Sequence, residues 1–226
     1  MNYWLHKKGS KGQEIKRIQK LIGELKVDGT FGATTEEAIK EYQLANKLNP
    51  DGVVGPETRK SLKIEIFPGI DISKWNKIQD WRKIKDTGLA KFCWVKATEG
   101  NNFLCNMFQK HYDNAKQVGI PAGAYHFARP DLHLDPYKEV ANFVKHCPIE
   151  KGDLRPVLDF EKAGEHDPDS IRDWVLTFLK EFEIQSGVRP IIYTGGNMTK
   201  YYLKGDTKGI DEYTLWHAYY SLSAHQ

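Results

Sequence analysis

The feature that most constrains the fold of this 226-residue chain is an alternation of short apolar runs with amphipathic segments, which begins at Phe67. Between the apolar runs, hydrophobic residues recur at helical spacing, as Ile78, Trp81 and Ile84 do. Strand, helix and strand repeated in this way predict a parallel sheet, and enough repeats close into a barrel. We therefore expect an α/β fold, an irregular TIM-like β/α barrel, with strands at 69–72, 92–97, 123–127, 157–160, 191–194 and 215–219.

Polar and aromatic side chains gather at the carboxyl ends of these predicted strands. In β/α barrels the chemistry takes place at that end, because the loops after the strands meet at one rim. Random placement would scatter such residues over helix surfaces and both rims, so their alignment indicates a site more strongly than any single residue does. The candidate site residues are Asp71, Lys96, Glu99, Tyr125, His126, Asp159, Glu161, Tyr193 and Trp216.

Among these candidates, Asp159 and Glu161 carry the most informative chemistry. They close the apolar run P-V-L-D-F-E at 156–161. Residues two apart in a strand share a face and lie about 7 Å apart along the backbone. Two carboxylates held close in a partly dry site cannot both ionise easily. The pKa of one of them rises, so that it can keep a proton near neutral pH. With Asp71 at the end of the first strand, this pattern predicts the paired acids of glycoside hydrolysis.

The other candidates are predicted to bind substrate. An aromatic face suits the apolar side of a sugar ring, so Tyr125, Tyr193 and Trp216 are candidate stacking surfaces, with core packing as the alternative for each. Lys96 and Glu99, at the end of the second predicted strand, are the charged candidates for substrate binding. For His126 the alternative is a hydrogen-bonded position inside the barrel.

Residues 1–64 follow a different pattern, which is short and helical. Apolar residues recur at helical spacing from Ile15 to Leu25. Ser10 and Gln13 precede them, and we expect this pair to cap the first helix.

Two further helices and a repeated turn complete the N-terminal pattern. The second helix is predicted to begin at Thr34, with Glu37 as its capping-box partner, and the third to begin at Pro56. The motif D-G-x-x-G occurs twice, at 28–32 and 51–55. Glycine supplies the positive φ of a tight turn and Asp bonds back to its own turn, so each copy predicts a rigid connector.

The charge distribution limits the range of partners. The formal net charge is +3, from 33 basic and 30 acidic residues, and the whole excess falls within residues 1–66. Basic residues are interleaved with acids there, which disfavours nucleic acid and favours an acidic partner such as the bacterial wall, or an ordinary solvated surface.

Cysteines, histidines and apolar runs exclude several other classes of protein. The three cysteines have no C-x-x-C spacing, so we expect reduced, buried thiols. The eight histidines show no H-E-x-x-H spacing, and we expect no metal and no other cofactor. Without an apolar run of about 18 residues or a secretory signal, we expect a soluble protein made in the cytoplasm that does not insert into membranes.

The N-terminal motifs resemble those of a known wall-binding domain. They are G-x-E-I-x-x-I-Q-x-L at 12–21, D-G-T-F-G-x-x-T at 28–35 and D-G-V-V-G-P-E-T at 51–58. In this order they are similar to the three-helix peptidoglycan-binding domain. The resemblance implies that residues 1–64 form a domain that holds the protein on bacterial peptidoglycan.

Six further motifs follow in a familiar order: G-I-D-I-S at 69–73, W-V-K-A-T-E-G at 94–100, G-A-Y-H-F-A at 123–128, P-V-L-D-F-E at 156–161, I-I-Y-T at 191–194 and L-W-H-A-Y-Y at 215–220. They resemble glycoside hydrolase family 25, the lysozymes of phage endolysins and bacterial autolysins. The resemblance implies a catalytic domain over 67–226 that cleaves the bond between N-acetylmuramic acid and N-acetylglucosamine. It also implies that Glu161 is the general acid and that Asp71 and Asp159 assist around the reacting sugar.

The sequence departs from the family at its C-terminal end. Members usually carry two further strands, one of them with a W-Q-Y motif, whereas this sequence stops at Gln226. We therefore expect C-terminal strands to be missing and the barrel to be incomplete, with unpaired sheet edges.

Rival functions remain open at this point. A chitinase would need an Asp where Val157 stands, and a metal-dependent amidase or peptidase would need clustered ligands that the histidines do not supply. A non-catalytic wall-binding protein would keep affinity for glycan without turnover. The missing signal segment favours a bacteriolytic phage lysin, which reaches the wall after release, over an exported autolysin.

Overall fold

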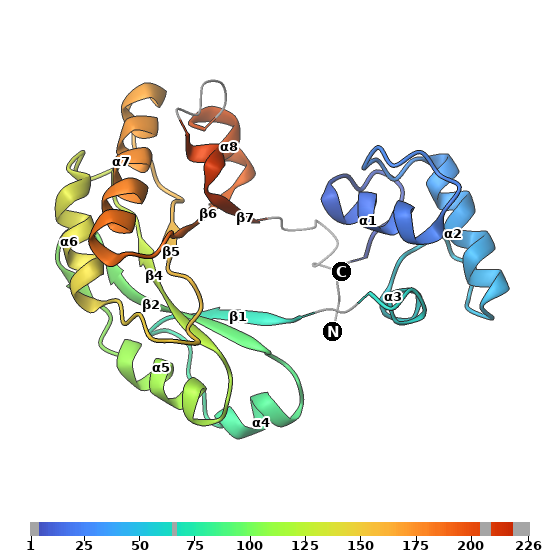
Figure 1. Ribbon diagram of the computed structural model, residues 1–226, viewed down its shortest axis with the longest axis horizontal. Helices are drawn as coiled ribbons and strands as arrows, with labels where there is room; N and C mark the ends of the chain where they lie inside the picture. The colour runs from blue at the N-terminus through green and yellow to red at the C-terminus, as the bar shows by residue number, and fades with distance from the viewer. Residues whose placement is uncertain (1–4, 65–66, 204–208, 219–226) are drawn as a thin grey trace. The chain divides into compact units, whose positions relative to one another are not determined.

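The computed structural model describes residues 5–64, 67–203 and 209–218 (Figure 1). These residues form two compact units, one within residues 5–64 and the other within 67–218. Each unit has its own hydrophobic core, as domains do.

The described part of the N-terminal unit contains the helices α1 (Gln13–Ile22), α2 (Ala33–Ala45) and α3 (Pro56–Ser61). Gly23 follows the last residue of α1, and its φ of 78° favours glycine. Helices and turns both contribute apolar side chains to one small core, so the turns are part of the packing. The buried residues are Ile15, Ile18, Phe31, Ile39, Val54, Leu62 and Ile64.

The caps predicted for the first two helices are wrong. Gly12 and Gly32 precede α1 and α2, and neither helix has a side-chain cap. The hydroxyl of Ser10 instead accepts a hydrogen bond from the backbone N–H of Lys7 at 3.2 Å, so it is engaged in a local turn. Thr34 lies inside the first turn of α2. The predicted start of the third helix at its proline is confirmed.

The first D-G-x-x-G turn is held by a buried glutamine. Gln19 of α1 is 2% exposed, and its Nε2 donates to Asp28 Oδ1 at 3.1 Å. The same Nε2 donates to the carbonyl oxygen of Thr30 and to the hydroxyl of Thr35, at 3.1 and 3.2 Å. Its Oε1 accepts the backbone N–H of Gly29 at 2.9 Å.

The second turn repeats this arrangement with Gln43 of α2, which is 1% exposed. Its Nε2 donates to Asp51 Oδ1, the carbonyl of Val53 and the hydroxyl of Thr58, at 2.8, 2.9 and 3.0 Å. Its Oε1 accepts the N–H of Gly52 at 2.9 Å. The doubled motif therefore marks an internal structural repeat, in which one buried amide satisfies each turn.

The C-terminal unit is built on one sheet with the strand order β1-β2-β4-β5-β6-β7, and every neighbouring pair along this path is parallel. β3 (Phe103–Leu104) pairs antiparallel with β2. The parallel strands are β1 (Gly69–Ile72), β2 (Phe92–Glu99), β4 (Ala122–Phe127), β5 (Val157–Asp159), β6 (Ile191–Gly195) and β7 (Thr214–Ala218).

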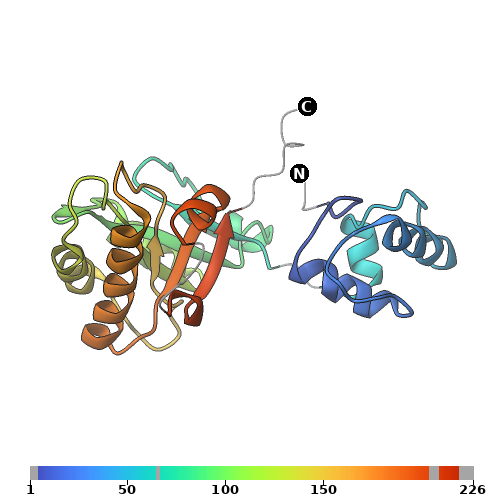
Figure 2. The ribbon, with the colours of Figure 1, turned by 90° about the horizontal axis from the view of Figure 1, so that it is seen from above.

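Helices cover one side of this curved sheet. Figure 1 shows α4, α5, α6 and α7 along the same side, and in Figure 2 β6 and β7 lie next to each other, coloured orange to red. Cys93 and Val95 of β2 point into the helical layer and are fully buried, whereas Trp94 and Lys96 alternate with them and are partly exposed. The helices are α4 (Trp81–Asp86), α5 (Phe108–Gln117), α6 (Pro136–His146), α7 (Pro168–Ser186), α8 (Gly196–Tyr201) and the 3-10 helix Ile210–Glu212.

The predicted fold class is confirmed. Each of the six predicted strands corresponds to one parallel strand of the sheet, and within the described residues β1 and β7 do not pair with each other. The sheet is therefore a curved half-barrel, as expected for an incomplete β/α barrel. Tyr219, the last residue of the sixth predicted strand, lies outside the described residues.

The predictions about cysteines and membrane spans can also be compared with the structure. Cys93, Cys105 and Cys147 are free and buried, as predicted. No helix in the described ranges is long and apolar enough to cross a membrane.

Candidate active site

One face of the sheet carries polar and aromatic side chains from every parallel strand. Residues that are neighbours in a parallel register, or two apart in one strand, project to the same side. The register therefore places eight residues on one face, which we call the inner face: Asp71, Trp94, Lys96, Tyr125, Phe127, Asp159, Tyr193 and Trp216.

Asp159, the last residue of β5, is buried on the inner face with 8% exposure. Its Oδ1 has no hydrogen-bond partner among the described residues. Burial, and after it the charge of Glu161, raise the pKa of Asp159 to about 8, against the opposing charge of Lys96. This carboxyl therefore holds its proton at neutral pH and keeps one polar atom free for a ligand.

Glu161 follows two residues later, beyond the end of β5, and is exposed. Partial burial and the charge of Asp71 raise the pKa of Glu161, while a hydrogen bond from Tyr193 and the charge of Lys162 lower it. Two acids on one strand end thus differ in environment: one is buried and one is open to solvent.

Asp71 completes a group of three acids. It is exposed at β1, and its charge acts on Asp159, on Glu161 and on Tyr125, whose pKa is raised by burial and by the neighbouring acids. The structure therefore brings together the three acids that the sequence predicted to be catalytic. Among the described residues, no group of three His, Cys, Asp or Glu side chains is arranged to hold a metal ion.

Lys96 and Glu99 lie beside these acids but engage each other. Lys96 Nζ contacts Glu99 Oε2 at 2.6 Å, and Arg129 Nη1 contacts Glu99 Oε1 at 2.8 Å. The ammonium of Lys96 also lies 4.4 Å from the centre of the Phe127 ring. Glu99 is thus paired with two cations, and its first contribution is to position Lys96.

A β-bulge makes this pairing feasible. Residues three apart in a regular strand point to opposite faces, but the register of β2 against β4 shifts between Lys96 and Thr98. Ala97 and Thr98 are both buried as a result, and Glu99 returns to the side of Lys96.

Two of the predicted stacking residues, Tyr193 of β6 and Trp216 of β7, form an aromatic wall with Trp94 of β2. The Trp216 ring lies 4.6 Å from that of Trp94 and 4.8 Å from that of Tyr193. All three rings are partly exposed, as is Tyr125. They therefore pack on one another and still offer faces to a ligand.

His126 is the one predicted site residue that the structure removes from the site. It is fully buried on the helix-covered face, where Nδ1 contacts Thr98 Oγ1 and Nε2 contacts Glu139 Oε2, each at 2.8 Å. Its assignment to substrate binding is wrong, because alternation along β4 turns it away from Tyr125 and Phe127. His126 is instead a hydrogen-bonded residue in the interior, which was the alternative interpretation.

Three residues near the site were missed from the sequence. Trp94 and Phe127 each lie two positions from a predicted site residue on the same strand, so strict alternation would have found them. Arg129, which pairs with Glu99 and with Asp131, gave no signal because it lies in the loop after β4.

Comparison with known sequences and structures places this geometry in a family. Residues 70–226 match the model of glycosyl hydrolases family 25, and residues 11–62 match that of a peptidoglycan binding domain. An uncharacterized protein, YegX of Escherichia coli K12, is 31% identical over 156 residues, which cover 67% of this chain and 56% of that protein.

Two further relatives have names that describe an activity. An autolytic lysozyme of Clostridium acetobutylicum is 29% identical over 155 residues, 69% of this chain and 45% of that protein. A solved muramidase from Trichobolus zukalii has a TM-score of 0.64 at 27% identity, over 71% of this chain and 81% of that chain. The chain spans about half the length of these curated relatives. Because the first family model covers more than half of it, this chain belongs to glycosyl hydrolases family 25.

Proposed function

We propose that this chain hydrolyses the β-1,4 bond between N-acetylmuramic acid and N-acetylglucosamine in bacterial peptidoglycan, as an endolysin-like lysozyme. The observation that carries the proposal is the pair Asp159 and Glu161, which share one strand end, have raised pKa values and differ in exposure. Two carboxyl groups in unlike environments are what glycoside hydrolysis requires. Membership of the family and the names of the relatives support the same reaction class.

Glu161 is the proposed general acid. It is exposed, so a glycan can reach it, and its raised pKa favours the protonated form that a general acid needs. It gives its proton to the leaving oxygen as the glycosidic bond breaks. Glu161 then takes a proton from the water that completes the reaction.

Asp159 is proposed to act on the N-acetyl group of the reacting sugar. Its free Oδ1 is the acceptor that we assign to the acetamido N–H. Accepting that bond favours the ionised carboxylate, which orients the acetamido oxygen for attack on the anomeric carbon and stabilises the positive charge that forms. Attack by this oxygen and then by water gives net retention, the substrate-assisted route known in some glycosidases.

Asp71 and the aromatic wall assist in this proposal. The charge of Asp71 raises the pKa of Glu161 and so favours its protonated form. The partly exposed faces of Tyr193 and Trp216 suit the apolar sides of sugar rings. The N-terminal unit, through its similarity to peptidoglycan binding domains, is proposed to keep the protein on the wall.

Product analysis tests the proposed reaction. Purified peptidoglycan incubated with the protein is expected to release muropeptides that end in reducing muramic acid, which mass spectrometry identifies after borohydride reduction. Free amines without new reducing ends would indicate an amidase or peptidase instead. Binding to peptidoglycan without any soluble product would indicate a wall-binding protein.

A further inference from the structure

A row of lysines and aromatic rings leads from the acids to the loop after β1. Lys96 Nζ lies 4.4 Å from the Phe127 ring centre and 5.9 Å from that of Phe103, and Lys74 Nζ lies 5.0 Å from the same Phe103 ring centre. Lys74 also lies 4.8 Å from the Trp75 ring. The contacts therefore form one continuous strip from Asp159 outward.

Trp75, at the outer end of this strip, is 80% exposed. Burying a tryptophan is strongly favourable, so one left in solvent contributes almost nothing to folding. The turn that carries it is ordered, because the backbone N–H of Ser73 donates to Asn76 Oδ1 at 2.9 Å. An exposed ring on an ordered turn beside a row of charges is suited to bind a ligand.

Lys74 and Lys162 are the two lysines of the strip whose charge is available to a ligand. Lys96 is paired with Glu99, but neither Lys74 nor Lys162 lies within ion-pair distance of a carboxylate in the described part of the chain. Lys162 lies 5.8 Å from the Phe127 ring centre. Its charge lowers the pKa values of Glu161 and Asp131. Lys74 and Lys162 thus belong to the strip without an ion-pair partner among the described residues.

We propose that Lys74, Trp75, Phe103 and Lys162 form a binding strip for glycan strands that carry carboxylates, so that the protein selects charged muramoyl strands over neutral N-acetylated glycans. The rings stack on sugars while the ammonium groups attract the carboxylates of the lactyl group or of the peptide stem. This inference deepens the proposed function and rests on the glycan being the ligand of the inner face.

Binding measurements on the full chain test the strip separately from turnover. The E161Q variant is titrated calorimetrically with three soluble probes: strands with peptide stems, strands whose stems an amidase has removed to leave lactyl carboxylates, and neutral chitin oligomers of equal length. Both charged probes are expected to bind at least about threefold more tightly than the neutral one, with a preference that falls as salt rises. The tighter of the two charged probes identifies which carboxylate is recognised.

Substitutions then assign the effect to named residues. Lys74→Gln and Lys162→Gln should each weaken binding of the charged probe about threefold and leave the neutral probe unchanged. Trp75→Ala should weaken the binding of the charged and the neutral probes alike, by a factor that does not depend on salt. These three side chains are exposed, so the variants are expected to fold.

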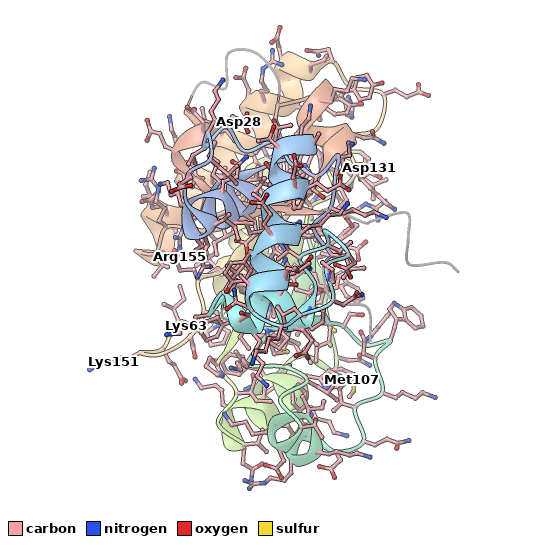
Figure 3. The ribbon with its side chains drawn as sticks, turned by 90° about the vertical axis from the view of Figure 1, so that its right-hand side faces the viewer. Asp28, Lys63, Met107, Asp131, Lys151 and Arg155 are labelled. Atoms are coloured by element: carbon pink, nitrogen blue, oxygen red, sulfur yellow. The ribbon has the colours of Figure 1, made fainter. Side chains whose placement is uncertain are left out.

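Lys151→Gln is the matched control. Lys151 is an exposed lysine in the segment before β5, and Figure 3 shows it far from Asp131, which is near Lys162. It should leave the affinity of all probes unchanged. Equal affinity for charged and neutral probes, or a K74Q and K162Q pair that behaves like K151Q, would overturn the strip. Failure of wild-type protein to cut peptidoglycan would instead overturn the proposed reaction.

Discussion

The two units bury polar side chains in opposite ways. In the N-terminal unit, Gln19 and Gln43 are almost fully buried. The Nε2 of each lies within hydrogen-bond distance of three acceptors, and its Oε1 accepts one backbone N–H. In the C-terminal unit Asp159 is also buried, yet its Oδ1 has no partner in the described residues. A satisfied buried amide stabilises a fold, whereas an unsatisfied buried carboxyl destabilises it.

The face of the sheet on which a carboxyl lies decides whether its missing hydrogen-bond partner indicates a ligand site. Glu139 Oε1 on the helix-covered side also lacks a partner among the described residues. Its other oxygen contacts His126, and Glu139 is fully buried, so no ligand can reach it. Asp159 lies on the inner face among aromatic rings and next to an exposed acid. An unsatisfied buried group therefore indicates a site when a substrate has access to it. Substitutions in the two units should therefore affect different properties.

Glu161→Gln should have the largest effect, and on activity alone. The amide keeps the size of the side chain but cannot supply a proton, so turnover of peptidoglycan should fall about 10³-fold. Reducing-end release measures this, and a Tm within about 2 °C of wild type shows that the fold is intact. A variant that lysed walls at the normal rate would contradict the assignment of Glu161.

Asp159→Asn should lower turnover about 10²-fold, because the amide cannot stabilise positive charge at the anomeric carbon. Its effect on stability should depend on pH. The folded-state pKa of about 8 lies above the ordinary value of 3.8 for an aspartate, so the wild type loses stability as pH rises from about 4 to about 8. The variant has no carboxyl to ionise and should be more stable than wild type at pH 9, by on the order of a few kcal/mol.

Urea unfolding of both proteins at pH 5 and pH 9 measures this difference. A stability gap that is the same at both pH values would show that Asp159 is not buried as the protonated acid.

Gln19→Ala and Gln43→Ala should destabilise the N-terminal unit without changing the chemistry. Each removes one buried amide that satisfies a whole turn, and each should cost about 2 kcal/mol of unfolding free energy in that unit. Hydrogen exchange of the N–H groups of Gly29 and Gly52 reports the loss locally. Gln109→Ala, at an exposed glutamine bonded to Asp113, is the control and should change stability by less than about 0.5 kcal/mol.

Tyr193→Phe should have the smallest effect. The Tyr193 hydroxyl donates to Glu161 and lowers the pKa of that carboxyl, so its removal should raise the pKa. The alkaline limb of the pH–activity profile, where Glu161 loses its proton, should move to higher pH by less than about one unit. A shift to lower pH would contradict this role for Tyr193.

Much of this architecture was predictable because it depends on local patterns. Alternating apolar runs located the strands, and the motif at the end of β5 located two neighbouring acids, although the strand ends at Asp159 and Glu161 lies beyond it. Helix starts in the N-terminal unit were predicted less well. Capping rules favour Ser10 and Thr34, but the N-cap residues of α1 and α2 are Gly12 and Gly32.

Short-range patterns were enough to predict which residue types stand at the strand ends and which two turns share one motif. The roles of those residues depend on how distant segments pack together. A bulge in β2 turned Glu99 toward Lys96, and alternation in β4 turned His126 into the core. Burial between neighbouring strands set the pKa of Asp159 far above its ordinary value. Solvent access and the nearness of distant charges arise only when the chain packs, so no local pattern encodes them.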